Sequence, residues 1–117
     1  MDIEQLTDFC LTMPNSVVET PFGPTTIVFK VYSKIFALIP LDAEVLAVNL
    51  KNLPEKNANL CEEYEGIIPG YHMNKLHWIT CRVDSDVKTV TLKQLITESY
   101  EIVLASIPLK KRSSLEQ

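Results

Sequence analysis

The sequence predicts a two-layer α+β domain: an antiparallel sheet of about four to five strands, with the N- and C-terminal helices packed on one face. Apolar residues recur at helical spacing near both ends of the chain, whereas the middle has the two-residue period of strands. The connections between the central strands are too short for parallel crossovers. The 117 residues fit one domain, with 108–117 expected to be a polar, partly frayed tail.

The first helix is expected over residues 2–12. Asp2, with Gln5 three positions later, is a capping signal, and apolar residues then follow at helical spacing until Pro14 ends the pattern. Residues 16–20 are compatible with a short strand. The Pro21-Phe22-Gly23-Pro24 stretch that follows predicts a rigid bend, because each proline restricts its own backbone and that of the preceding residue.

Three strands are predicted next, over residues 25–32, 34–41 and 44–51. The links between them are so short that they indicate antiparallel hairpins, so this part of the sheet is expected to be a meander.

A second helix is expected to begin after Asn52, which precedes Pro54, and to end by Gly66. A Pro69-Gly70 turn then leads into a strand over residues 78–83. Thr91 and Gln94 predict a capping box for the last helix, which Pro108 ends.

Strand parity separates a core face from a free face. Alternate residues of a strand point to opposite sides of the sheet, and the two end helices can cover one side only. The residues predicted for the core are Phe29, Leu46, Val48, Ile79, Leu95 and Val103. The residues predicted for the free face form a cationic and aromatic stripe: Lys30, Tyr32, Lys51, Trp78 and Arg82. The alternative to a functional stripe is that the lysines are simply solvated and that Trp78 is buried.

Composition narrows the class of protein. The hydrophobic share of 46% and charged share of 22% are ordinary for a soluble globular domain, and a cytoplasmic location is expected because the N-terminus lacks a signal-peptide pattern. No apolar run approaches the roughly 20 residues that span a bilayer, so no membrane association is expected. A net charge of −4 argues against strong nucleic-acid binding through bulk charge. The odd number and wide spacing of Cys10, Cys61 and Cys81 predict buried, reduced thiols.

Catalytic and metal-binding patterns are weak, so we expect neither an enzyme nor a metal or cofactor. His72 and His77 are five residues apart. Neither a helix nor a strand would bring two rings at this spacing to one metal ion. His77 and Cys81 share a strand face but lie roughly 13 Å apart at about 3.3 Å per residue. The chain contains no G-x-S-x-G elbow and no glycine-rich phosphate loop.

Several segments together resemble the MmcQ/YjbR family of small bacterial proteins. They are Glu19-Thr20-Pro21-Phe22-Gly23, Val28-Phe29-Lys30-Val31, Lys34-Ile35-Phe36-Ala37-Leu38, Leu50-Lys51 with Pro54-Glu55, Pro69-Gly70-Tyr71-His72-Met73-Asn74-Lys75-Leu76-His77-Trp78, and Ser99-Tyr100. The resemblance implies a two-layer α+β fold likened to frataxin-type proteins and secretion chaperones. It also implies DNA binding through a proposed double-wing arrangement, a label that the acidic balance of this chain does not favour.

Two functions are open at this point. The first is weak binding of DNA or single-stranded nucleic acid, with lysines and arginine on phosphates and aromatic rings on unpaired bases. The second is a protein-interaction or adaptor domain that uses the same partly apolar face. The candidate binding residues are Lys30, Tyr32, Lys51, His72, Asn74, Lys75, His77, Trp78 and Arg82, with Lys110-Lys111-Arg112 as a further basic segment.

Overall fold

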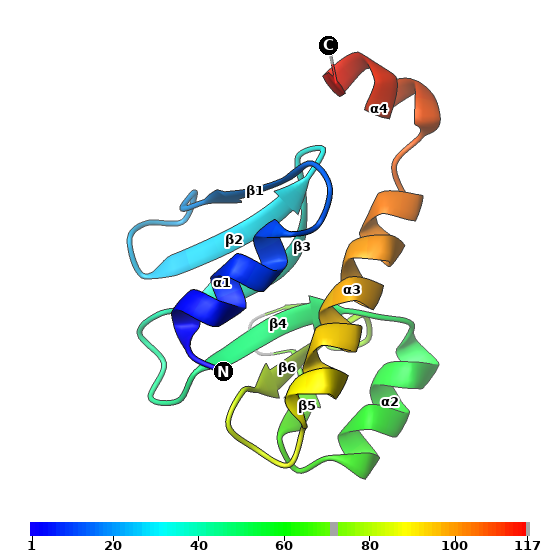
Figure 1. Cartoon of the computed structure of the whole chain (residues 1–117). Helices are drawn as coiled ribbons and strands as arrows, with labels where there is room; N and C mark the ends of the chain where they lie inside the picture. Colours follow the sequence, from blue (N-terminus) through cyan, green and yellow to red (C-terminus); the bar gives the residue numbers. More distant parts are fainter. Residues whose placement is uncertain (71–72, 117) are drawn as a thin grey trace.

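The computed structural model describes residues 1–70 and 73–116, with side chains described up to residue 112. Figure 1 shows helices layered over one side of a twisted sheet, with the last helix standing away from the rest of the molecule. The elements in chain order are α1 (Ile3–Leu11), β1 (Ser16–Glu19), β2 (Thr26–Val31), β3 (Lys34–Pro40), β4 (Ala47–Lys51), α2 (Pro54–Glu63), β5 (Ile67–Pro69), β6 (Trp78–Arg82), α3 (Thr89–Ala105) and α4 (Leu109–Glu116).

The sheet has six strands in the order β1-β2-β3-β4-β6-β5, and all neighbours are antiparallel. The predicted α+β class and the meander of β2, β3 and β4 are therefore confirmed, while the strand number is higher than predicted. The strand that the prediction lacked is β5, whose three residues are too few for an alternating pattern and end in proline. No helix in the described ranges is long and apolar enough to span a membrane.

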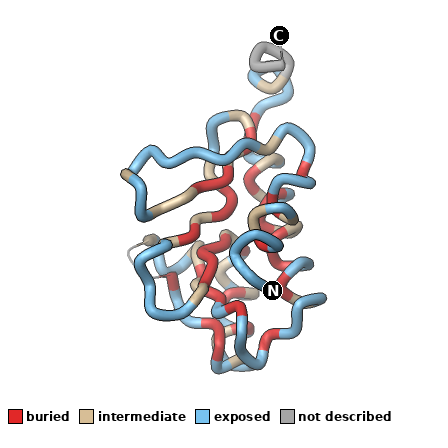
Figure 2. Tube along the Cα trace, turned by 60° about the vertical axis from the view of Figure 1, so that its left-hand side comes forward, coloured by how far each residue is buried: buried red, intermediate tan, exposed pale blue. Residues whose placement is uncertain are grey.

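The three helices that pack against the sheet share one face. Leu6 and Cys10 of α1, Leu60 of α2 and the apolar stripe of α3 belong to one cluster with the inward side chains of the strands. Figure 2 shows buried residues concentrated between these layers, with exposed loops around them. Of the predicted core, Phe29, Val48, Ile79, Leu95 and Val103 are buried, and Leu46 is half-buried against the same cluster.

Helix boundaries follow the predicted signals only in part. Asp2 caps α1 in a full capping box with Gln5, as predicted. The predicted cap of α2 is wrong by one residue: Leu53 is the N-cap, and the side chain of Asn52 instead accepts a hydrogen bond from the Leu53 N–H. Asn52 is 4% exposed and also donates to Glu98 of α3, so tertiary contacts engage the side chain that could otherwise cap the helix.

The last two helices also differ from the prediction. The α3 helix begins at Thr89 rather than at a Thr91 capping box, because the buried Val87 fixes the chain just before it and helical geometry starts there. Residues 109–116 form α4 where a frayed tail was expected. A proline is tolerated in the first turn of a helix, so Pro108 can end α3 and still precede α4.

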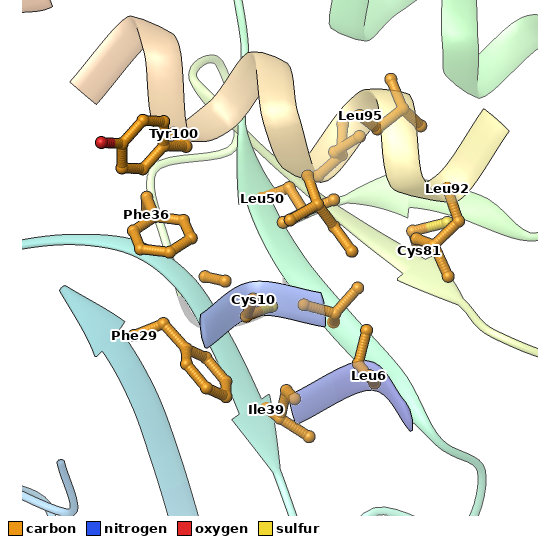
Figure 3. Packing of buried hydrophobic residues seen from close by; sticks show 14 of the residues in the cluster. Leu6, Cys10, Phe29, Phe36, Ile39, Leu50, Cys81, Leu92, Leu95 and Tyr100 are labelled. Carbon is orange, nitrogen blue, oxygen red and sulfur yellow. The ribbon is translucent and has the colours of Figure 1, made fainter. Parts of the chain in front are cut away.

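A register shift in the β2–β3 hairpin shapes the sheet. Phe29 is opposite Ala37 but Lys30 is opposite Ile35, so Phe36 is an extra residue on β3. As a result Phe36 and Ala37 are both fully buried. Figure 3 shows Phe29, Phe36 and Tyr100 close together in the core, where Phe36 meets the Tyr100 ring edge-on at a centroid distance of 5.3 Å.

Candidate binding face on the open side of the sheet

The sheet face opposite the helices is the candidate site, and we call it the open face. Residues directly opposite one another in antiparallel strands point to the same side. The register therefore places one continuous row on the open face, across all six strands: Glu19, Val28, Leu38, Asn49, Thr80 and Ile68. On one side of this row lie Thr26, Pro40, Ala47 and Arg82, and on the other lie Lys30, Ile35, Lys51 and Trp78.

The open face is hollowed at its centre. Phe22, from the loop between β1 and β2, and Met73, from the loop between β5 and β6, flank a hollow of about 770 Å³ over the middle strands. We call this the face hollow. Its surface is mainly apolar, with Leu38 and Ile68 among the strand residues that line it. Phe22 is 64% exposed, so a large aromatic side chain lines the hollow instead of filling the core.

A polar pair lies within this apolar surface. Asn49 is only 3% exposed, and its Oδ1 accepts a hydrogen bond from the Thr80 hydroxyl. Its Nδ2 donates to the Leu38 carbonyl at 3.5 Å, the long limit for such a bond. β3 and β6, which lie on either side of β4, thus hold the buried Asn49 amide in a fixed orientation beneath the face hollow.

Four of the predicted residues lie on the open face. Lys51 and Trp78 are cross-strand partners, and both are half-buried. Arg82 is exposed and lines the face hollow. Lys30 is on the same face, but its ammonium is 3.1 Å from the carboxylate of Glu19 on the neighbouring strand. That ion pair offsets its charge, so Lys30 contributes less to a cationic surface than its position suggests.

Tyr32 is not on the open face, which corrects the parity prediction. It lies in the tight turn between β2 and β3, where Tyr32 and Ser33 have positive φ angles of 46° and 70°. A left-handed turn ends the two-residue alternation, so parity cannot be continued through it. The Tyr32 ring packs against the core and its hydroxyl accepts a hydrogen bond from Asn15 at 2.9 Å.

The segment after β5 is organised mainly by its own backbone. The Asn74 side chain accepts a hydrogen bond from the Leu76 N–H at 2.9 Å. The Asn74 carbonyl accepts from the N–H groups of His77 and Trp78. Asn57 of α2 reaches across to donate to the Leu76 carbonyl. Asn74 is therefore a turn residue in this structure, while Lys75 is exposed at the tip.

Only one of the two histidines lies within the described residues. His77 is half-buried and lies in the turn just before β6, where its carbonyl accepts a hydrogen bond from the Asn52 N–H at 3.0 Å. His72 lies outside the described residues. Gly70 is needed beside Trp78: a Cβ at Gly70 would come within 2.8 Å of the Trp78 Cβ, so the close packing of the two strands depends on glycine.

The three cysteines are buried or half-buried, and the described part of the chain contains no metal-binding cluster. Burial raises the pKa of Cys10 and of Cys81 to about 12, with the charge of Asp86 adding to the effect at Cys81. Such thiols are not nucleophiles at neutral pH. Within residues 1–70 and 73–116, no group of three or more His, Cys, Asp or Glu side chains is placed to hold a metal ion.

Sequence reasoning missed the residues that flank the face hollow. The sequence places Phe22 in a rigid bend and Met73 in a segment of the family resemblance, and it gives neither residue a binding role. The available signal was an aromatic residue between Pro21 and Pro24, where the chain cannot fold the ring into a helix or strand. Met73 carries no comparable signal, because its position over the sheet depends on the path of the whole loop.

Comparison with known proteins identifies the family. The model of the YjbR family matches residues 11–102, which is most of the chain. The chain belongs to the YjbR family. Among curated relatives, "Uncharacterized protein YbdF" of Escherichia coli O157:H7 is 40% identical over 84 residues, 72% of this chain and 69% of the relative. "Uncharacterized protein YjbR" of Escherichia coli strain K12 is 29% identical over 119 residues, covering 100% of this chain and 99% of the relative.

Solved structures of similar proteins share the fold of this YjbR-family chain. A Deinococcus radiodurans protein, DR2400, with a domain described as DUF419, superposes with a TM-score of 0.88 at 32% identity over 97% of this chain and 87% of that one. A Pseudomonas syringae protein, structural genomics target PsR293, gives a TM-score of 0.78 at 27% identity over 88% of this chain and 99% of that one. The resemblance found from the sequence is therefore confirmed at the level of family and fold.

Proposed function

We propose that this YjbR-family chain is a non-enzymatic binding module that takes single-stranded nucleic acid on its open face, through the end formed by Lys51 and Trp78. The observation that carries the proposal is their cross-strand pairing on a sheet face that the packed helices leave uncovered. A base can stack on an aromatic ring while a neighbouring cation contacts its phosphate. Lys75, in the loop that leads into Trp78, and Arg82, on the same strand, extend the cationic surface.

The shape of the face favours single strands over duplex DNA. Open antiparallel sheets with helices behind them bind unpaired bases across their strands, as in common RNA-binding modules. Reading a duplex instead requires a helix or ribbon that protrudes into a groove. The open face does not protrude in this way, because it is hollowed at its centre. The net charge of −4 keeps the expected affinity at roughly micromolar or weaker at physiological salt.

A second candidate is a protein-docking domain, and the face hollow is the observation that favours it. Its apolar surface would bind an apolar segment of a partner chain, with the cations serving only at the rim. The two candidates differ in their dependence on salt. Phosphate contacts weaken steeply as salt rises, whereas apolar docking changes little.

Titration of labelled single-stranded and duplex oligonucleotides at low and physiological salt tests the proposal. Trp78 is the sole tryptophan, so its fluorescence reports stacking at this position directly. We expect single strands to bind more tightly than duplex and to quench Trp78. With Lys51, Lys75 and Arg82 each on one phosphate, the plot of log K against log salt should have a slope of about −2.

Matched variants separate this site from bulk charge. Lys51→Ala should weaken binding to every sequence. It should also make the plot of log K against log salt less steep by the contribution of about one phosphate contact. Lys93→Ala removes the same charge from α3 on the helix side and should leave binding unchanged. Absence of oligonucleotide binding at low salt, or an equal effect of the two variants, would overturn the proposal. Binding of a partner chain that survives high salt would then support the protein-docking candidate.

A further inference from the structure

The face hollow has the size and lining of a small-molecule site. Its volume of about 770 Å³ lies within the roughly 300–1,000 Å³ that is usual for ligand pockets. Phe22 and Met73 line it from the loops, and Leu38 and Ile68 contribute apolar surface from the sheet. Lys51 and Trp78 do not line it. Of the residues that line the hollow, the nucleic-acid proposal therefore uses only Arg82.

The polar groups around the hollow include two nitrogen donors, the Asn49 amide and the Arg82 guanidinium. The Oδ1 of Asn49 is engaged by the Thr80 hydroxyl, and the one bond found for its Nδ2 within the described residues is the 3.5 Å contact to Leu38. The amide therefore keeps donor capacity, although the side chain is almost fully buried. A buried amide with a donor to spare beside an apolar hollow favours a ligand that brings an acceptor.

Arg82 supplies a charged donor beside this amide. It lies one position along from the Asn49–Thr80 pair and takes part in none of the ion pairs found among the described residues. Asp42 also lines the hollow, but it belongs to the exposed loop between β3 and β4 and not to a strand of the sheet. The charge that a sheet strand holds at the hollow is thus positive, and guanidinium groups bind carboxylates in paired hydrogen bonds.

We propose that the face hollow binds a small amphipathic carboxylic acid, with its apolar body between Phe22 and Met73 and its carboxylate on Arg82 and the Asn49 amide. This site shares Arg82 with the nucleic-acid proposal but otherwise uses different residues, and it does not depend on that proposal. Ala47, which is opposite Arg82 and lines the same hollow, contributes only a methyl group, so the space above it is open to a ligand.

Decanoate, 1-decanol and decylamine share one chain length and differ in the head group, so together they test the proposal. Their binding to the full chain would be followed by heteronuclear NMR and calorimetry below the micellar range. Decanoate should bind most tightly and shift the Asn49 side-chain amide and the Met73 methyl signals. Arg82→Met should weaken decanoate by about tenfold and leave decanol unchanged, as expected for loss of a charge-assisted hydrogen bond.

Two further variants test the location of the site. Phe22→Ala removes a largely exposed side chain at the hollow, so the fold should be preserved while decanoate binding weakens. Val90→Ala, at an exposed apolar residue of α3, should have no effect on binding. Equal affinity for the three head groups, insensitivity to Arg82→Met, or shifts confined to other surfaces would each overturn the inference. Loss of oligonucleotide binding in Lys51→Ala with decanoate binding intact would show that the two sites are distinct.

Discussion

The Ser99 hydroxyl bridges β3 and β4 at the point where the hydrogen-bonded ladder between them ends. Its Oγ accepts a hydrogen bond from the Lys51 N–H at 2.8 Å and donates to the Phe36 carbonyl at 2.6 Å. The paired positions of β3 and β4 are Ala37 with Leu50 and Leu38 with Asn49, so both bridged groups lie just beyond the ladder. The side chain is fully buried, and water cannot easily replace it.

Replacing Ser99 with alanine should therefore be costly. It leaves a buried N–H and a buried C=O without partners, and each such group costs about 1–3 kcal/mol. Because relaxation of the strands recovers part of this, we expect a loss of about 2–4 kcal/mol in the free energy of unfolding. That is a large fraction of the ~5–15 kcal/mol typical of a domain. For a chain of this size the melting temperature should fall by roughly 10 °C.

Urea unfolding followed by Trp78 fluorescence and by circular dichroism measures this loss. Thr97→Ala is the matched control, because the Thr97 hydroxyl donates within α3 to the Lys93 carbonyl at 2.9 Å and is not buried. It should change stability by less than about 0.5 kcal/mol. The amide of Lys51 should also lose protection from hydrogen exchange in Ser99→Ala only. Equal stability of the two variants, with unchanged m-values, would refute the bridging role.

Two further predictions concern titratable groups. A thiol reagent should modify Cys61 in the native chain, while Cys10 and Cys81, whose pKa burial raises to about 12, react only after unfolding. Equal rates for all three thiols would contradict the packing described here. The backbone N–H groups of residues 66 and 65 lower the pKa of Asp86, which accepts from both at 2.8 Å. Its contribution to stability is present above the ordinary carboxyl pKa and is lost as pH falls through the lowered folded value, so Asp86→Asn should flatten the acid side of the stability profile. If the stability of Asp86→Asn falls at low pH as steeply as that of the wild type, Asp86 does not contribute to this pH dependence.

Much of the fold could be predicted from local patterns in the sequence. Helical spacing, alternation and the Asp2 cap act over a few residues, so α1, α3 and the central strands follow from the chain itself. Which face of those strands is buried also followed for Phe29, Val48 and Ile79, because a period of two leaves only two choices. The family resemblance likewise depended on the order of short segments along the chain.

The site could be predicted only in part, because it depends on contacts between distant segments. Lys51 and Trp78 were assigned to one face by parity, but their direct pairing depends on β6 lying between β4 and β5 in the sheet. The same holds for Lys30, whose charge is offset by Glu19 across a strand boundary. Cross-strand partners are set by sheet order, which single-chain periodicity does not contain.

The amino-acid sequence by itself thus determined the α+β class, the core-facing residues and the family, since each is encoded in patterns of a few residues or in their order. Tertiary structure alone decided that Tyr32 packs against the core, that the Asn49 amide lies beneath an apolar hollow, and that Phe22 and Met73 line this hollow. Those features arise where a left-handed turn breaks strand parity and where loops fold back over the sheet. Their energies depend on neighbours that lie tens of residues away along the chain.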